Sequence, residues 1–118
     1  VTLIQGSDLG NGVTDSIVDS WIAPYAGYLR YGNYQAMTTT AVASFRLLNN
    51  TTSQAVVAAT TPTAGTAAAL TLVAAGQRFA EGDEIQLLVT TSGGSGAMKG
   101  LAVHLMFTQL AGTATKPV

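Results

Sequence analysis

The sequence contains no cysteine. Thiol chemistry and a disulfide framework are therefore excluded, and this absence is typical of proteins that assemble inside a cell. With 118 residues, the chain is long enough to bury a core without disulfides or a structural metal. We therefore expect a single domain over residues 1–118, with an N-terminal arm at 1–12 and a flexible C-terminal tail at 111–118.

Charged residues are also scarce. They make up 9% of the chain, whereas an average soluble protein has roughly 25%. The formal net charge of −1 gives little attraction for a phosphate backbone, so we do not expect nucleic acid as a partner. Because so few charges repel copies of the chain only weakly, the composition favours a surface that other subunits cover. The alternative is that the abundant Thr and Ser side chains solvate an exposed β surface.

Long apolar runs are missing as well. No apolar run approaches the roughly 20 residues of a membrane span. No basic segment precedes an apolar one in the manner of a signal peptide. We therefore expect neither a membrane partner nor a signal peptide.

What the sequence does contain is a series of short apolar segments separated by Gly, Pro and Asn turns. In the segment 84–91, Ile85, Leu87 and Val89 alternate with mostly polar residues, which predicts a strand with one buried face. About eight such segments and no convincing helix predict an all-β fold, either an antiparallel β-sandwich or a barrel. The other expected strands cover residues 2–5, 13–22, 26–37, 41–48, 54–59, 66–73 and 101–110.

The segment Trp21–Leu29 predicts a structural corner between two strands. Pro24 has no N–H to donate to a ladder and forces the residue before it into an extended conformation, so a central strand cannot continue through it. Gly27 lets the chain turn, and Trp21 is large enough to bury roughly 150–250 Å² in the core. Nothing in this corner is chemically reactive, so the prediction is a structural joint.

Strict alternation then assigns the faces of the two strands at this corner. In the strand before the corner, Ile17 is expected to share a face with Trp21. In the strand after it, Tyr28 and Tyr34 are expected on the face opposite to Tyr31. An interior glycine of that second strand, Gly32, predicts a bulge or the close approach of another backbone.

Four tyrosines, Tyr25, Tyr28, Tyr31 and Tyr34, recur at a spacing of three. The neighbouring glycines and proline argue against a helix, and on a strand the four side chains fall on both faces, so they cannot all lie in the core. They either divide between the core and a subunit seam or form a platform that stacks on sugars or anchors a partner. The mildly polar face of the last strand is a second part of this candidate interface. The candidate subunit interface therefore comprises Tyr28, Tyr31, Tyr34, Ala102, His104 and Met106.

Three motifs together resemble a known group of proteins. They are a Trp-x-Ala-Pro-aromatic-x-Gly-x-Leu corner at 21–29, a strand that ends in an Asn turn at 45–50, and a Phe-Ala-x-Gly-Asp-x-Ile segment at 79–85. A Gly-rich loop and a terminal apolar strand follow. This order resembles the small jelly-roll-like β-sandwich domains of tailed-phage virion proteins, especially head decoration (cement) proteins and head or tail fibre modules.

The resemblance implies a jelly-roll sandwich that assembles as a homotrimer and binds the major capsid protein of a phage head. It implies assembly in the host cytoplasm and a final location on the capsid surface. The alternative within the same group is a receptor- or glycan-binding tip of a fibre. Trimeric complement-type and tumour-necrosis-factor-like heads carry a similar Gly-Asp turn, which leaves a secreted trimer as a third hypothesis. The expected corner residues are Trp21, Pro24, Gly27, Phe79, Gly82 and Asp83.

Catalytic chemistry is not expected. His104 is the only histidine, and no acidic residue lies near it in sequence, so a packed or interface position is favoured. At a subunit contact it would make assembly sensitive to pH. The segment between Asp8 and Asp19 has Val13 where a calcium loop needs Gly, and Gly10 and Gly12 offer no side-chain oxygen. No Ser stands in a nucleophile-elbow context. The sequence therefore predicts no enzyme activity, cofactor or metal.

Overall fold

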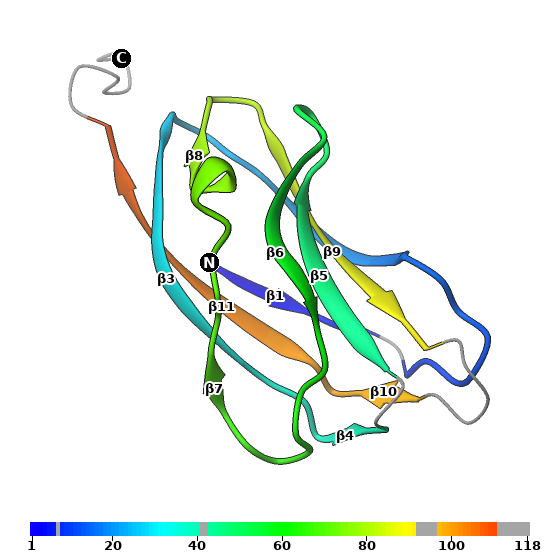
Figure 1. Ribbon diagram of the computed structural model, residues 1–118. Helices are drawn as coiled ribbons and strands as arrows, with labels where there is room; N and C mark the ends of the chain where they lie inside the picture. Colours follow the sequence, from blue (N-terminus) through cyan, green and yellow to red (C-terminus); the bar gives the residue numbers. More distant parts are fainter. Residues whose placement is uncertain (7, 41–42, 92–96, 111–118) are drawn as a thin grey trace.

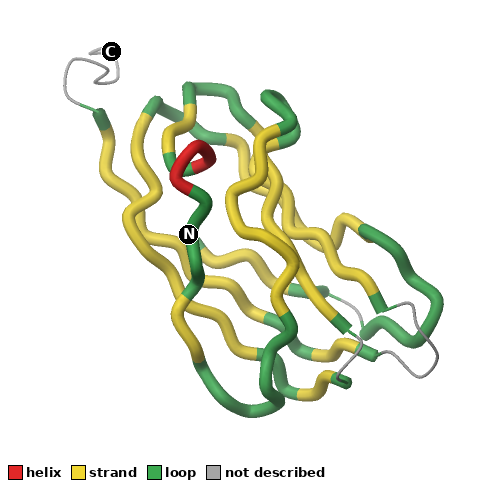
Figure 2. The backbone as a smooth tube through the Cα atoms, viewed as in Figure 1, coloured by secondary structure: helices red, strands yellow, loops and turns green. Residues whose placement is uncertain are grey.

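The structure is a computed structural model that describes residues 1–6, 8–40, 43–91 and 97–110. These residues form two antiparallel sheets that face each other (Figure 1), joined by loops at both ends (Figure 2). The strands are β1 (Thr2–Ile4), β2 (Ser16–Ile22), β3 (Gly27–Gln35), β4 (Thr38–Thr39), β5 (Ser44–Asn49), β6 (Gln54–Thr60), β7 (Ala68–Ala69), β8 (Arg78–Phe79), β9 (Glu84–Thr90), β10 (Met98–Lys99) and β11 (Ala102–Gln109), with one 3₁₀ turn, η1 (Ala74–Gly76).

The strand order is that of a jelly roll. One sheet, here called the β11 sheet, has the order β1-β11-β3-β7, and β8 also pairs with β3. The other, the β9 sheet, has the order β2-β9-β5-β6. The chain crosses repeatedly between the sheets, so each sheet combines strands from both ends of the sequence, as in the two Greek keys of a jelly roll. The expected all-β, antiparallel, jelly-roll-like sandwich is confirmed, and a small β4–β10 ribbon is added to it.

The core lies between the two sheets and is built by alternating side chains. Ile85, Leu87 and Val89 of β9 are 3%, 0% and 0% exposed, as their alternation predicts. Side chains of Val103 and Leu105 on β11 belong to the same buried cluster. Removing each such side chain from water stabilises the fold by about 1.5–3 kcal/mol. The outer face of β9 is also covered, since Gln86 and Leu88 are buried in spite of their alternation with the inward residues.

The first part of the predicted N-terminal arm at 1–12, residues 2–5, is built into the sandwich and is not an arm. β1 pairs with β11 in the register Leu3↔Val103, and Leu3 is only 1% exposed. Gln5 is buried as well, and its side chain donates a hydrogen bond to the Met98 carbonyl at 2.7 Å. The apolar Leu3 makes this segment an integral edge strand of the sandwich. The predicted tail at 111–118 lies outside the described residues.

The strand expected at 66–73 is also corrected. Only Ala68–Ala69 pairs as a strand, and the chain then crosses from one sheet to the other. The Leu70 amide bonds to the Gly32 carbonyl of β3, whereas the Val73 amide bonds to the Val56 carbonyl of β6. A segment whose hydrogen bonds go to two different sheets cannot continue as one strand.

Two bulges correct the predicted faces. In β2 the register shifts between Ile17 and Asp19, so Trp21 packs against the core whereas Ile17 is 58% exposed. In β3 the register shift opposite β11 makes Arg30 the extra residue. Because one inserted residue reverses the alternation, Tyr28 and Tyr31 share the outer face and Tyr34 faces inward.

Candidate interaction surface

The residues of the predicted corner meet at the end of the sandwich where β3 and β9 begin (Figure 1). The Trp21 ring contacts the Phe79 ring edge-to-face, with 5.5 Å between centroids. It also stacks on Phe107 at 4.3 Å, a partner from β11 that sequence reasoning did not assign to the corner. The sequence signal for this contact was that Phe107 lies two residues after Leu105, on the same inward face of the predicted strand. Such aromatic pairs add about 0.5–1.5 kcal/mol each beyond the burial of their area.

Hydrogen bonds join the two turns of the corner. The Gly82 amide donates to the Ala23 carbonyl at 2.8 Å, and the Ala23 amide donates to the Asp83 carbonyl at 2.9 Å. Gly82 has a φ of +86°, a conformation that glycine adopts readily. Pro24, exposed next to Ala23, contributes by ending β2. The corner is therefore a closed structural unit that fixes how β2 leads into β3.

Gly27 completes this unit by its lack of a side chain. It pairs with Phe79 across β3 and β8, and a Cβ at this position would lie 2.9 Å from the Phe79 ring. The same Cβ would collide with the Thr108 carbonyl of β11. The glycine is required here by the close approach of its neighbours on both sides.

The outer face of the β11 sheet carries most of the candidate interface. Ala102, His104 and Met106 point outward from β11, and Tyr28 and Tyr31 point outward from β3. Met106 is the direct partner of Tyr31 across the two strands, and these side chains are 50% and 60% exposed.

Tyr34 does not belong to this surface. Its ring lies on the inner side, 4.9 Å from the buried Phe45 ring, because the bulge at Arg30 reverses the faces of β3. Gly32 does not form the bulge, but a Cβ there would collide with the His104 carbonyl of β11, so the alternative prediction, the close approach of another backbone, is confirmed.

Sequence reasoning missed the contribution of β1 to the same surface. Ile4 pairs with Ala102 and Thr2 pairs with His104, so both extend the face across a third strand. Ile4 is 53% exposed. We call the set Ile4, Tyr31, Ala102, His104 and Met106 the β11 face. None of these five side chains is an acid, a lysine or an arginine.

His104 is held by its neighbour in β1. Its Nδ1 lies 2.9 Å from the Thr2 hydroxyl oxygen, which fixes the imidazole on the β11 face. Its other cross-strand partner is Asn33 of β3. His104 is exposed, and neither of these two cross-strand neighbours is acidic.

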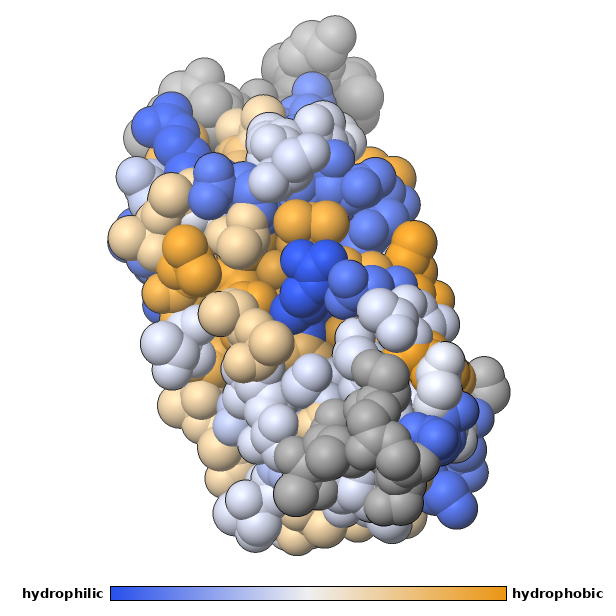
Figure 3. All heavy atoms as spheres, turned by 45° about the vertical axis from the view of Figure 1, so that its right-hand side comes forward, coloured by the Kyte–Doolittle hydropathy of each residue, from blue (hydrophilic) through white to orange (hydrophobic). Residues whose placement is uncertain are grey.

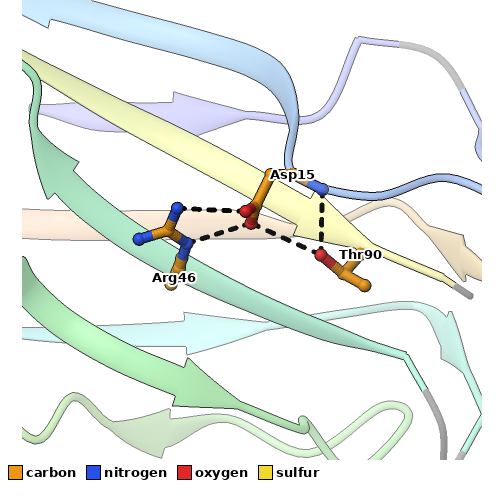
Figure 4. Close-up of polar contacts among 3 residues, drawn as sticks. All are labelled: Asp15, Arg46 and Thr90. Atoms are coloured by element: carbon orange, nitrogen blue, oxygen red, sulfur yellow. Dashed lines mark hydrogen bonds and ion pairs between the residues drawn. The ribbon is translucent and has the colours of Figure 1, made fainter.

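The outer face of the β9 sheet is different, because its centre is charged. Figure 3 turns this side forward and shows hydrophilic residues in the middle with hydrophobic residues on both sides. Arg46 Nε and Nη2 donate to the two carboxylate oxygens of Asp15 at 2.9 and 3.1 Å. Thr90 accepts a hydrogen bond from the Asp15 amide at 3.0 Å (Figure 4). Hydrogen bonds from Arg46 lower the pKa of Asp15, partly offset by burial, and raise the pKa of Arg46.

Asp19, one of the two ends of the rejected calcium loop, has a structural role. One carboxylate oxygen accepts a hydrogen bond from the Ile4 amide at 2.8 Å, and the other accepts one from the Ser20 amide at 2.8 Å. The first bond links the edge of one sheet to the other. Within the described residues, no group of three or more His, Asp or Glu side chains is placed to hold a metal ion.

The part of the chain that the structure describes contains no helix long and apolar enough to cross a membrane. Comparison with known proteins adds no relative, since no family model, curated protein or solved structure matches the chain.

Proposed function

We propose that this protein is a non-enzymatic structural component of a virion, a homotrimer that decorates and stabilises a phage head. One observation carries the proposal: the β11 face is an exposed surface of apolar and uncharged side chains in a jelly-roll sandwich. Jelly rolls are common among capsid proteins. The phage assignment itself rests on the sequence motifs at 21–29, 45–50 and 79–85.

The composition of the β11 face supports a subunit seam. Cores of protein interfaces are depleted in charge and enriched in Met and aromatic residues, and Met106 and Tyr31 are such residues. Ala102 between them and Ile4 is small enough to permit close approach of a second sheet. Three copies of an uncharged face can meet around an axis without like-charge repulsion. In the proposed seam, the centre is formed by Ile4, Ala102, His104 and Met106, and Tyr31 lies at the margin.

In this proposal the trimer binds only the assembled lattice of the major capsid protein. A ligand that binds the assembled state and not its separated parts stabilises that state by mass action. The trimer therefore opposes the outward pressure of packaged DNA. Because β1 is part of the sandwich, removal of residues 1–12 is not a clean test of capsid binding.

Light scattering of the protein during size-exclusion chromatography tests the seam. Wild type is expected to be a trimer, and Ala102→Glu, which places three carboxylates at the seam, a monomer. Ala58→Glu is the matched control, since Ala58 is exposed on β6 of the other sheet, and it is expected to remain trimeric. A monomeric wild type, or the same response to both substitutions, contradicts the trimer.

Capsid binding is tested separately by cryo-microscopy of DNA-filled heads. Purified wild-type protein is expected to occupy three-fold or quasi-three-fold positions on heads that lack it, and Ala102→Glu to leave them empty. If the protein is a trimer but leaves these positions unoccupied, the proposed capsid decoration is refuted and the proposed trimer seam is retained.

A further inference from the structure

A second feature of the β11 sheet lies at the end of the β11 face, where β8 joins β3. Thr108, Tyr28 and Arg78 form one row across β11, β3 and β8. Residues paired in register point to the same side of a sheet, so all three side chains lie on the outer surface. The Arg30 guanidinium is 5.3 Å from the centre of the Tyr28 ring, and its Nε donates to the Thr108 hydroxyl at 2.8 Å.

The cluster of Arg30, Arg78 and Tyr28 contains two cations, and among the described residues no carboxylate forms an ion pair with either of them. Within the described part of the chain, the one ion pair is between Arg46 and Asp15 on the other sheet. Arg30 and Arg78 are both exposed and flank the same tyrosine. Two like charges close together on one surface repel each other. An anion bound between the two guanidinium groups would offset this repulsion.

The backbone adds to this arrangement. The bulge of β3 brings both Arg30 and the next residue, Tyr31, to the outer face. Bulges commonly aim side chains beside functional sites. As a result, the exposed Tyr31 directly follows, on the same face, an arginine whose guanidinium is already held by Thr108. A group held in place before binding loses less conformational entropy when a ligand arrives.

We propose that Arg30 and Arg78 form a binding site for an acidic saccharide. The oxyanion of the sugar, a carboxylate or a phosphate, binds the two guanidinium groups, which suit the geometry of both. The sugar ring packs against Tyr31, and the hydroxyl of Thr108 lies beside it as a neutral hydrogen-bonding group. An aromatic ring offers a large apolar face, and a hydroxyl both donates and accepts hydrogen bonds, so the pair suits a sugar ring better than a purely acidic protein surface. Arg30, Arg78 and Thr108 lie outside the β11 face, and Tyr31 lies at its margin, so the binding of the oxyanion does not depend on the proposed capsid function.

Calorimetric titration with defined probes tests the site. Trigalacturonic acid supplies a carboxylate, glucose 6-phosphate supplies a phosphate, and galactotriose is a neutral trisaccharide control. At least one acidic probe is expected to bind and galactotriose is not. Which acidic probe binds more tightly identifies the source of the oxyanion. Added salt is expected to weaken binding, because exposed charges are screened.

Substitutions locate the site. Arg30→Gln and Arg78→Gln are each expected to lower affinity about tenfold or more, given the strength of hydrogen bonds to charged groups. Arg30→Lys keeps the charge but loses the planar fork, so an intermediate loss is expected. Lys99→Gln removes an exposed cation from β10 and is expected to change nothing.

Two results overturn the proposal: neither acidic probe binds, or Lys99→Gln weakens binding as much as the arginine variants. Thermal unfolding of each variant checks that the fold is retained. The trimer is expected to persist in Arg78→Gln by light scattering. Failure of this site therefore leaves the seam intact, and failure of the seam leaves saccharide binding measurable.

Discussion

The side-chain amide of Asn49 donates a hydrogen bond of 2.9 Å to the carboxylate of Asp83, 34 positions away in the chain. Both residues are buried, with 1% and 5% of their surface exposed. The same Asp83 oxygen accepts a hydrogen bond from the Ala80 amide at 2.9 Å. Asn49 Oδ1 accepts hydrogen bonds from the Thr51 and Thr52 amides at 3.1 and 3.3 Å. This pair therefore ties the β5–β6 hairpin to the turn that begins β9.

Replacement of Asp83 by Ala is expected to destabilise the domain strongly. It leaves the buried Asn49 amide and the Ala80 N–H without their acceptor, at a cost of about 1–3 kcal/mol for each group. Urea unfolding measures the loss. Asp8→Ala is the control, because Asp8 is exposed and its loss is expected to be within about 0.5 kcal/mol of wild type. An equal response of the two variants would mean that the buried carboxylate adds no stability.

A second prediction concerns Gly27. Gly27→Ala forces a Cβ into the space of the Phe79 ring and the Thr108 carbonyl, and overpacking of this kind costs about 1–3 kcal/mol. The control is Gly6→Ala, since a Cβ at Gly6 has no neighbour within 4 Å. Midpoints of thermal unfolding are expected to fall for Gly27→Ala and to stay or rise slightly for Gly6→Ala. A midpoint that Gly27→Ala leaves unchanged would show that the corner relaxes around the methyl group.

The sequence was a good guide where alternation is uninterrupted and a poor one where a bulge interrupts it. The buried face of β9 was predicted because Ile85, Leu87 and Val89 follow strict alternation. In β3, Arg30 adds one residue opposite β11 and exchanges the faces of Tyr31 and Tyr34. No residue type in this segment predicts the inserted residue, because the position of a bulge depends on how two distant strands pair.

The candidate surface shows the same limit. Outward positions of β11 followed from alternation within one strand. The contribution of Ile4 could not be predicted in this way, because it depends on β1 pairing with a strand about 100 residues later. The cluster of Arg30, Arg78 and Tyr28 likewise joins β3 to β8 through pairing that sequence spacing does not reveal.

The last prediction concerns the pH dependence of the Asp15–Arg46 pair. The pKa of Asp15 is lower in the folded state than the ordinary value, so the carboxylate contributes stability at pH values above the unfolded pKa of about 3.9. That contribution is lost as pH falls through the lower, folded pKa, and Arg46 stays charged throughout. The carboxylate is 46% exposed, and exposed pairs contribute only about 0.2–1 kcal/mol.

Asp15→Asn is the appropriate test, because Asp15 has a φ of +47° and asparagine tolerates that conformation. In urea titrations, wild type is expected to be slightly more stable than Asp15→Asn at pH 7, with the difference disappearing toward pH 2. Molar salt is expected to shrink the difference at pH 7, since it screens exposed charges. A difference that persists unchanged from pH 7 to pH 2 would assign the effect of Asp15 to its backbone conformation rather than to its charge.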